Sequence, residues 1–346
     1  MFKTKAKSEN IDRAYRFLKA VDITPEDDTF HGNIKFLDIE WWYFDAIFDN
    51  GYSIHIGVRT YHLRNIGFIQ SRIDIYKKGK TEVEAVKTDL ISKSKVNSNY
   101  PTIKINNKPV IEFDYNHYKN KEKWKYHLYL KIGNNEVDLI FISTTKGWKI
   151  ETADTCWAVP LPKAKVNGTI TLKGKKIKVA GLGYHYHNWS YSPFTAIKNL
   201  GWFWGRITAD TLNITFAKTM QDIEKSDIIL VLNQDSNDNY NSENFYNFRP
   251  EDINFIPKNF IYNNHRRIPT EFDLTAINKK SGYSPSIDIN VNMRTLNVHH
   301  TRLFIINYWR YHVVTNGEIN LGSKIEKLDN KTQIIEFISF KSKDVQ

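Results

Sequence analysis

The run WKYHLYLKIGNNEVDLIFIST at residues 124–144 contains the pattern that repeats through most of the chain. Apolar and polar side chains alternate on both sides of the central Gly133-Asn134-Asn135. Such alternation is typical of a strand with one buried face, and a short turn rich in Gly and Asn favours a hairpin. The run therefore predicts two antiparallel strands, 124–132 and 136–144.

The same rhythm recurs before and after this hairpin. Polar turns at residues 49–51, 77–80 and 173–176 are flanked by alternating segments, and Asn316-Gly317 predicts one more hairpin turn. In the second half the predicted strands are 201–208, 212–220, 228–233, 272–278, 286–294, 309–316 and 334–340. Aromatic residues make up 14% of the chain, which also favours sheet. We expect an all-β protein of antiparallel barrels or sandwiches.

The 346 residues suffice for two domains. Pro193 marks the best break, because proline cannot lie within a central strand. Only residues 8–20 show a helical period of apolar side chains. We therefore expect an N-terminal helical extension at 1–28, a first β domain at 29–194 and a second β domain at 195–346.

The net charge of +11 and the pI near 9.3 describe a basic surface. Such a surface could contact nucleic acid, anionic lipid or an acidic substrate. Much of the lysine falls in predicted hairpin turns, and no nucleic-acid motif accompanies it. We expect no nucleic-acid partner and leave peripheral contact with an anionic membrane open.

Composition also bears on the compartment. No run of about 18 apolar residues predicts a transmembrane helix, and the first residues do not resemble a signal peptide. Cys156 is the single cysteine, so no disulfide can form within the chain. These features predict a cytoplasmic protein, in which Cys156 is a small buried apolar residue.

The segment EWWYFD at residues 40–45 places an acid among aromatic rings. Because side chains alternate across a strand, Glu40 and Trp42 would share one face. Apolar surroundings would raise the pKa of Glu40 and make it a candidate general acid. The alternative is a buried carboxylate paired with Arg206 or Arg310.

The segment GYHYHNW at residues 183–189 adds two imidazoles. One face would carry His185, His187 and Trp189, and the other Tyr184, Tyr186 and Asn188. Two such imidazoles can transfer protons or bind a metal. A metal needs a third ligand, for which His55 and His312 are candidates. The structural alternative is a pair of hydrogen-bonded histidines within a barrel wall.

Two further segments combine aromatic rings with arginine, GWFWGR at residues 201–206 and YWRYH at residues 308–312. The side chains that would share a face are Trp202, Trp204 and Arg206 in the first and Tyr308, Arg310 and His312 in the second. Arginine stacks on rings and binds carboxylates through two N–H groups. We expect one face of each segment to be core and the other to border a cleft.

Phosphate-binding glycine loops, dinucleotide fingerprints and serine elbows are not evident in the sequence. We therefore expect no cofactor and no metal. Aromatic walls with a few fixed polar groups are typical of a pocket for a large apolar ligand. We expect His185, His187 and Glu40 to handle protons. The side chains expected to contact the ligand are Trp42, Tyr43, Tyr186, Asn188, Trp189, Trp202, Trp204, Arg206, Arg310 and His312.

These segments together resemble the carotenoid 1,2-hydratase (hydroxyneurosporene synthase) superfamily, which includes AttH-like proteins and lipocalin-like Diels–Alderases. The resemblance spans about residues 30–340 and rests on residues 40–43, 183–189 and 202–206, with support from 308–313 and 336–340. It implies two lipocalin-like antiparallel β-barrels. The motifs indicate the superfamily and not one reaction within it.

The resemblance also implies a chemistry. In the hydratases an acidic residue protonates an isoprenoid double bond and aromatic rings stabilise the carbocation. Cyclase-type relatives bind polyenes between the barrels and fix their shape. The chain departs from the pattern at Tyr186, where the family motif carries Asp. Its segment 212–220 also lacks the carboxylate that a hydratase would place there.

We therefore expect the chain to bind an apolar isoprenoid or polyene-like small molecule in an aromatic cleft. Cofactor-free hydration, isomerisation or cyclisation would occur there. The alternative is a lipocalin-type carrier that binds a lipid or another hydrophobic ligand without reacting. The sequence leaves the oligomeric state open.

Overall fold

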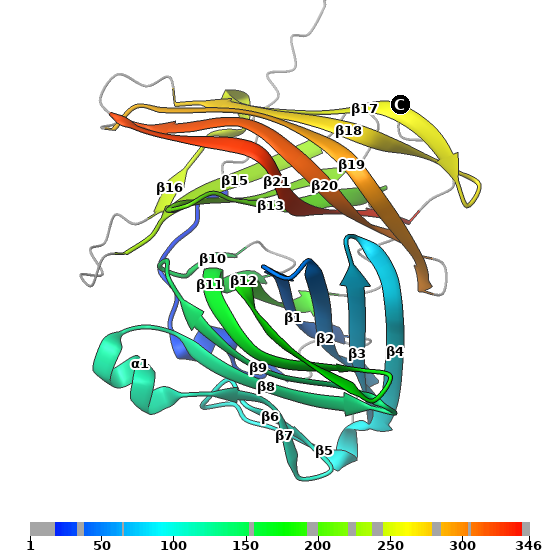
Figure 1. Cartoon of the computed structure of the whole chain (residues 1–346). Helices are drawn as coiled ribbons and strands as arrows, with labels where there is room; N and C mark the ends of the chain where they lie inside the picture. Colours follow the sequence, from blue (N-terminus) through cyan, green and yellow to red (C-terminus); the bar gives the residue numbers. More distant parts are fainter. Residues whose placement is uncertain are drawn as a thin grey trace, which may run out of the picture.

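Two curled antiparallel sheets make up the protein (Figure 1). The structure, a computed structural model, describes residues 18–32, 38–63, 66–151, 156–191, 200–220, 226–236, 245–278, 285–303 and 306–340. The first sheet curls into a nearly closed barrel and the second into a half-barrel. Both shapes agree with the all-β, two-barrel expectation.

The first sheet has the strand order β4-β3-β2-β1-β12-β11-β9-β8-β7-β6-β5, with β10 paired to β11. Its strands are β1 (Asp38–Phe48), β2 (Tyr52–Leu63), β3 (Ile66–Lys77), β4 (Lys80–Leu90), β5 (Ser94–Val96), β6 (Ile103–Ile105), β7 (Lys108–Phe113), β8 (Lys125–Ile132), β9 (Asn135–Ser143), β10 (Trp148–Glu151), β11 (Cys156–Leu172) and β12 (Lys175–Tyr191). The order places β1 beside β12, so the EWWYFD and GYHYHNW segments are neighbours.

The second sheet has the order β16-β15-β14-β13-β21-β20-β19-β18-β17. Its strands are β13 (Gly201–Thr208), β14 (Leu212–Met220), β15 (Ser226–Gln234), β16 (Phe245–Asn247), β17 (Ile253–Asn263), β18 (Arg266–Ile277), β19 (Ile287–Leu303), β20 (Ile306–Leu321) and β21 (Lys324–Ser339). The boundary expected between residues 194 and 195 falls between β12 and β13, outside the described residues.

Helical structure is sparse in the described residues. It consists of α1 (Tyr115–Lys121) and the 3-10 turns η1 (Pro25–Asp28), η2 (Ile91–Lys93) and η3 (Pro250–Asp252). The helix expected at residues 8–20 lies outside the described residues up to residue 17, and residues 18–20 are not helical. Asp114 caps α1 by accepting a hydrogen bond from the His117 backbone N–H.

The predicted hairpin at residues 124–144 is confirmed as β8 and β9, with Ile132 opposite Asn135. The turn predicted at Asn316-Gly317 is wrong, because β20 continues through both residues. Gly317 instead lies at a β-bulge with φ of 136°. A side chain there would meet the Asn290 backbone oxygen of β19 at 2.1 Å. Glycine is thus needed for close approach of β19.

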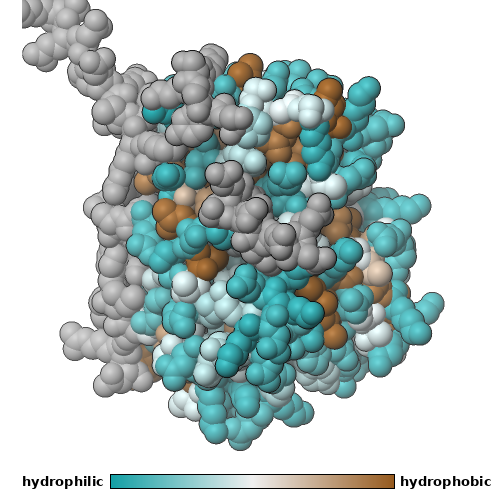
Figure 2. All heavy atoms as spheres, turned by 90° about the vertical axis from the view of Figure 1, so that its left-hand side faces the viewer, coloured by the Kyte–Doolittle hydropathy of each residue, from teal (hydrophilic) through white to brown (hydrophobic). Residues whose placement is uncertain are grey.

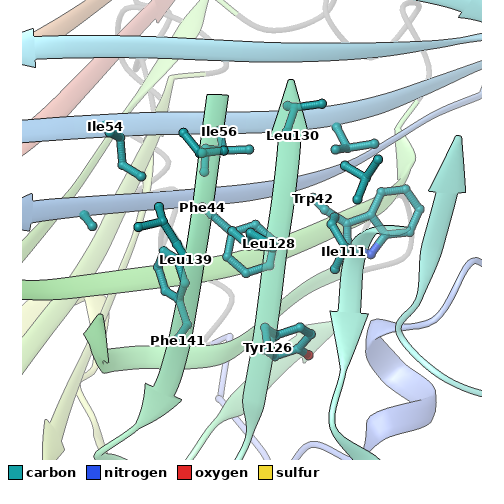
Figure 3. Packing of buried hydrophobic residues seen from close by; sticks show 14 of the residues in the cluster. Trp42, Phe44, Ile54, Ile56, Ile111, Tyr126, Leu128, Leu130, Leu139 and Phe141 are labelled. Carbon is teal, nitrogen blue, oxygen red and sulfur yellow. The ribbon is translucent and has the colours of Figure 1, made fainter. Parts of the chain in front are cut away.

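Each sheet encloses its own apolar core. Figure 3 shows that of the first barrel, where Trp42, Phe44 and Phe141 pack with aliphatic side chains. Cys156 belongs to this core, and burial raises the pKa of its thiol to about 12. The second core belongs to the half-barrel and contains side chains such as Phe203. Burying this apolar area is the main stabilising contribution to both sheets.

β1 and β12 are buried on both faces. Trp42 and Phe44 point into the first barrel, whereas Tyr43 belongs to a third cluster between the sheets, together with Tyr184 and Trp204. These two strands therefore form a wall shared by the barrel interior and the inter-sheet contact.

The outer surface is largely hydrophilic on the face shown in Figure 2, with apolar side chains in separate small groups. Among the described residues, no helix has both the length and the apolar composition of a membrane span.

Candidate functional site

The first group of candidate residues surrounds a buried carboxylate, Asp28, at the end of η1. Its Oδ2 accepts a hydrogen bond from the Tyr126 hydroxyl at 2.5 Å and lies 3.0 Å from His185 Nε2. Trp42 Nε1 donates to the backbone oxygen of the same residue. Burial opposes ionisation of Asp28, but the charge and hydrogen bond of His185 outweigh it and lower the pKa of Asp28.

His187 lies between two carboxylates. Its Nε2 is 2.9 Å from Glu40 Oε1, and its Nδ1 is 3.4 Å from Asp28 Oδ1. Its ring stacks on Trp42 with a centroid separation of 4.3 Å. Burial opposes protonation of His187, but the two neighbouring carboxylates prevail and raise its pKa.

Glu40 also contacts His31, which precedes β1. Glu40 Oε1 accepts from the His31 backbone N–H at 3.0 Å and lies 3.4 Å from its Nδ1. The expectation of a raised Glu40 pKa is wrong. Burial does oppose its ionisation, but hydrogen bonds with His187 and His31 lower the pKa of Glu40. The expected pairing of Glu40 with Arg206 or Arg310 is also wrong.

His185 and His187 share the inner face of the wall, as the alternation predicted, and Glu40, Asp28 and His31 meet them there. We call Asp28, His31, Glu40, His185 and His187 the inner network. The candidate third metal ligands, His55 and His312, are not part of it. His55 binds Asp74 at 2.8 Å, and His312 Nε2 lies 2.8 Å from the Ser53 hydroxyl, both on the outer side.

The outer face of the wall carries a second network, joining both sheets. Arg206 of β13 pairs with Asp45 of β1, with its Nη2 at 2.6 Å from Oδ1. Arg310 of β20 pairs with Glu336 of β21, and the Tyr43 hydroxyl donates to that same carboxylate at 2.6 Å. We call Tyr43, Asp45, Arg206, Arg310 and Glu336 the outer network.

Aromatic rings pack beside the outer network. Tyr43 stacks on Tyr186 at 4.6 Å between centroids, and Trp204 lies 5.4 Å from Tyr43 and 5.1 Å from Tyr184. The expectation that Trp42, His187 and Trp204 line one cleft is therefore wrong. Consecutive side chains of a strand point to opposite faces, and the wall separates Trp204 from the other two.

At the margin of this contact lies a half-buried group, Trp41, Arg59, Tyr61 and Tyr186, which we call the Arg59 cluster. Trp41 of β1 is directly opposite Arg59 of β2. The Arg59 guanidinium donates to the Tyr61 hydroxyl at 3.3 Å and lies 5.9 Å from the Trp41 ring centre. Arg59 and Tyr186 are both half-buried.

The Arg59 cluster has more hydrogen-bond donors than acceptors. Among the described residues, Arg59 has no carboxylate partner. Tyr61 and Tyr186 each accept one bond, from Arg59 and from Trp41 Nε1, and donate none to a described residue. Burial raises the pKa of Tyr186, so its hydroxyl stays protonated. One cation and two hydroxyl donors are therefore free to bind an anion or a carbonyl oxygen.

Comparison with solved structures identifies the fold. An AttH protein of Nitrosomonas europaea superposes with a TM-score of 0.62 at 13% identity, covering 93% of this chain and 97% of that one. CghA, solved with Sch210972, gives 0.52 at 7% identity with 88% of both chains covered. The chain has the AttH fold.

A lower TM-score, 0.49, relates it to kievitone hydratase from Nectria haematococca, at 13% identity over 88% of this chain and 89% of that one. No family model matches the sequence, and no curated protein matches it. The AttH fold agrees with the resemblance noted in the sequence.

On this AttH fold the remaining candidate residues lie apart. Trp189 stacks on His31 at 3.8 Å and so joins the inner face. Asn188 donates to the Cys156 backbone oxygen, Trp202 contacts Phe340, and His312 is buried at the edge of the sheet contact. Burial lowers the pKa of His312 to about 3.

Seven residues of these sites were not predicted: Asp28, His31, Trp41, Asp45, Arg59, Tyr61 and Glu336. Asp28 and His31 precede β1 and have no strand periodicity, so no sequence signal brings them to His187. Asp45 and Arg59 do lie on predicted strands. Their shared face with Tyr43 could have been read from the alternation of β1 and β2.

Proposed function

We propose that the chain binds a largely apolar, conjugated small molecule whose carboxylate or carbonyl oxygen is held by the Arg59 cluster. The observation that carries this proposal is that Arg59, Tyr61 and Tyr186 have more hydrogen-bond donors than acceptors among the residues that the structure describes. A charged donor that is partly withdrawn from water gains from a nearby acceptor, and a ligand oxygen would supply one. The rings of Trp41 and Tyr43 would contact the apolar part.

The proposal extends to catalysis without a cofactor. Hydrogen-bond donors that are in position before a reaction stabilise the negative charge that develops on a ligand oxygen when an enolate forms. Isomerisation or cyclisation of a conjugated carbonyl compound therefore suits this cluster better than hydration does. Hydration needs a strong acid, and Glu40 lies on the opposite side of the wall with a lowered pKa. The structure solved with Sch210972 supports small-molecule binding in proteins of this fold.

The test uses a matched pair of polyene probes, retinoic acid and retinol, followed by quenching of tryptophan fluorescence. Arg59→Met keeps the length of the side chain and removes its charge. We expect this change to weaken binding of the acid about tenfold or more, since charge-assisted hydrogen bonds contribute about 1.5–3 kcal/mol. Binding of the alcohol should change little.

Arg267→Met is the control, because Arg267 is exposed and lies 4.7 Å above the Phe260 ring. Equal loss of both probes in Arg59→Met, or equal loss in the control, would contradict the proposal. Compounds that copurify with the chain are then incubated with it and followed by mass spectrometry. Binding without conversion would identify a carrier and remove the catalytic part.

A further inference from the structure

We propose that His31, Glu40 and His187 form a binding site for a divalent transition-metal ion. One ligand atom from each residue lies within 4.8 Å of the other two. His187 Nε2 is 2.9 Å from Glu40 Oε1, and His31 Nδ1 is 3.4 Å from the same oxygen. The three residues come from two parts of the chain, one before and within β1 and the other in β12.

These separations are close to those of a metal centre. Zinc binds imidazole nitrogen and carboxylate oxygen at about 2.0–2.1 Å in a tetrahedron, which places neighbouring ligand atoms roughly 3.3 Å apart. Two imidazoles and one carboxylate form a donor set that zinc and other first-row divalent metals accept. Small side-chain rotations would suffice to close the triad around an ion.

The groups behind the ligands are those that support a metal. His187 Nδ1 faces Asp28 Oδ1 at 3.4 Å, so a carboxylate can fix the ring with Nε2 toward the ion. Trp42 stacks on His187, and Trp189 stacks on His31 with an interplanar angle of 5°. Both imidazoles are therefore held in place before an ion arrives.

Charge also favours a cation here. Asp28 and Glu40 are both buried, and their ion-pair partners among the described residues are all histidines. Glu40 Oε2 is buried and has no hydrogen-bond partner. A divalent ion beside Glu40 would place positive charge next to both carboxylates and give this oxygen a partner.

An ion has a route of entry and an open coordination position. The His31 side chain is 22% exposed while that of Glu40 is fully buried, so the triad opens to solvent through His31. Three protein ligands leave a fourth position for water, the arrangement of catalytic zinc sites. The ion would replace the proton between His187 and Glu40. This inference departs from the expectation of no metal and is independent of the Arg59 cluster, which lies across the wall.

The experiment is a titration of the metal-free full chain with Co²⁺, followed by visible absorption, and with Zn²⁺, followed by calorimetry. We expect one ion per chain. His31→Ala should lower the affinity for the metal more than tenfold, because it removes one of three ligands. The fold should tolerate this change, since the His31 side chain is partly exposed. Asp28→Asn should lower it about tenfold, the effect of losing an outer-shell carboxylate.

His127→Ala is the matched control. His127 is a half-exposed histidine 2.7 Å from Asp138, so it has the same chemistry outside the triad. Circular dichroism verifies that each variant is folded, and Glu40→Gln provides a second ligand variant. Absence of binding, unchanged affinity in folded His31→Ala, or loss of binding in His127→Ala would overturn the site. None of these results depends on polyene binding.

Discussion

The two faces of β1 and β12 differ in the charge of the ligand that each could bind. The inner network has carboxylates and imidazoles, and its Glu40 Oε2 is a buried acceptor without a hydrogen-bond partner among the described residues. The Arg59 cluster at the edge of the outer face has donors that find no acceptor in the described part of the chain. A surplus of acceptors is suited to a cation and a surplus of donors to an anion. Neighbouring residues of one strand thus contribute to sites that suit ligands of opposite charge.

The centre of the outer network differs from both. There Asp45 and Glu336 meet Arg206, Arg310 and Tyr43, so charges are paired within the protein. Such pairs add specificity to the docking of two sheets, and each charge of this network has a partner of opposite sign. The comparison therefore separates a structural region from two regions open to binding.

The largest expected effect comes from Asp45→Ala, which would leave Arg206 buried without its carboxylate. Breaking a buried pair in this way costs about 3–5 kcal/mol, measured as the free energy of unfolding in urea. Lys331→Ala is the control, since its pair with Asp210 is exposed and should contribute at most about 1 kcal/mol. Equal effects of the two changes would show that the outer network does not hold the sheets together.

A smaller effect is expected on the inner face from Tyr126→Phe. The change removes one hydroxyl that donates to the buried Asp28 carboxylate. Hydrogen bonds to charged groups contribute about 1.5–3 kcal/mol, so unfolding should become easier by that amount. Tyr129→Phe, three residues further along β8, changes a half-buried side chain and should change stability by less than about 0.5 kcal/mol. Similar values for both would mean that Asp28 is not stabilised by its partners.

The smallest effect concerns pH. Burial opposes ionisation of Asp74, but hydrogen bonding and charge from His55 and Arg72 lower its pKa. A lowered pKa adds stability above the unfolded value, about 3.9, and this stability is lost as the pH falls toward the folded value. The difference in unfolding free energy between wild type and Asp74→Asn should therefore shrink below about pH 4. A constant difference from pH 7 to pH 3 would refute the assignment.

Local sequence predicted the strands because their alternation is nearly unbroken. The segments 201–208 and 212–220 match β13 and β14 at both ends, since a strand that buries one face must repeat every two residues. The prediction of a turn at Asn316-Gly317 was wrong because the same dipeptide also suits a bulge. Local sequence cannot tell whether a glycine ends a strand or lets its neighbour approach.

Local sequence also predicted which side chains of the site share a face, but not which faces meet. His185 and His187 were placed together correctly. Their carboxylate partner Asp28 was not found, since a 3-10 turn before β1 reaches the barrel interior only through tertiary packing. Trp204 was assigned to the same cleft as Trp42, because the sequence does not say on which side of β1 the second sheet docks.

Burial of β1 and β12 on both sides has a consequence for folding. A slip of their pairing by one residue would exchange the two environments and present Phe44 to Arg206 in place of Asp45. Docking of the half-barrel onto the barrel therefore favours the correct register, since only a correctly aligned first sheet presents Asp45 to Arg206.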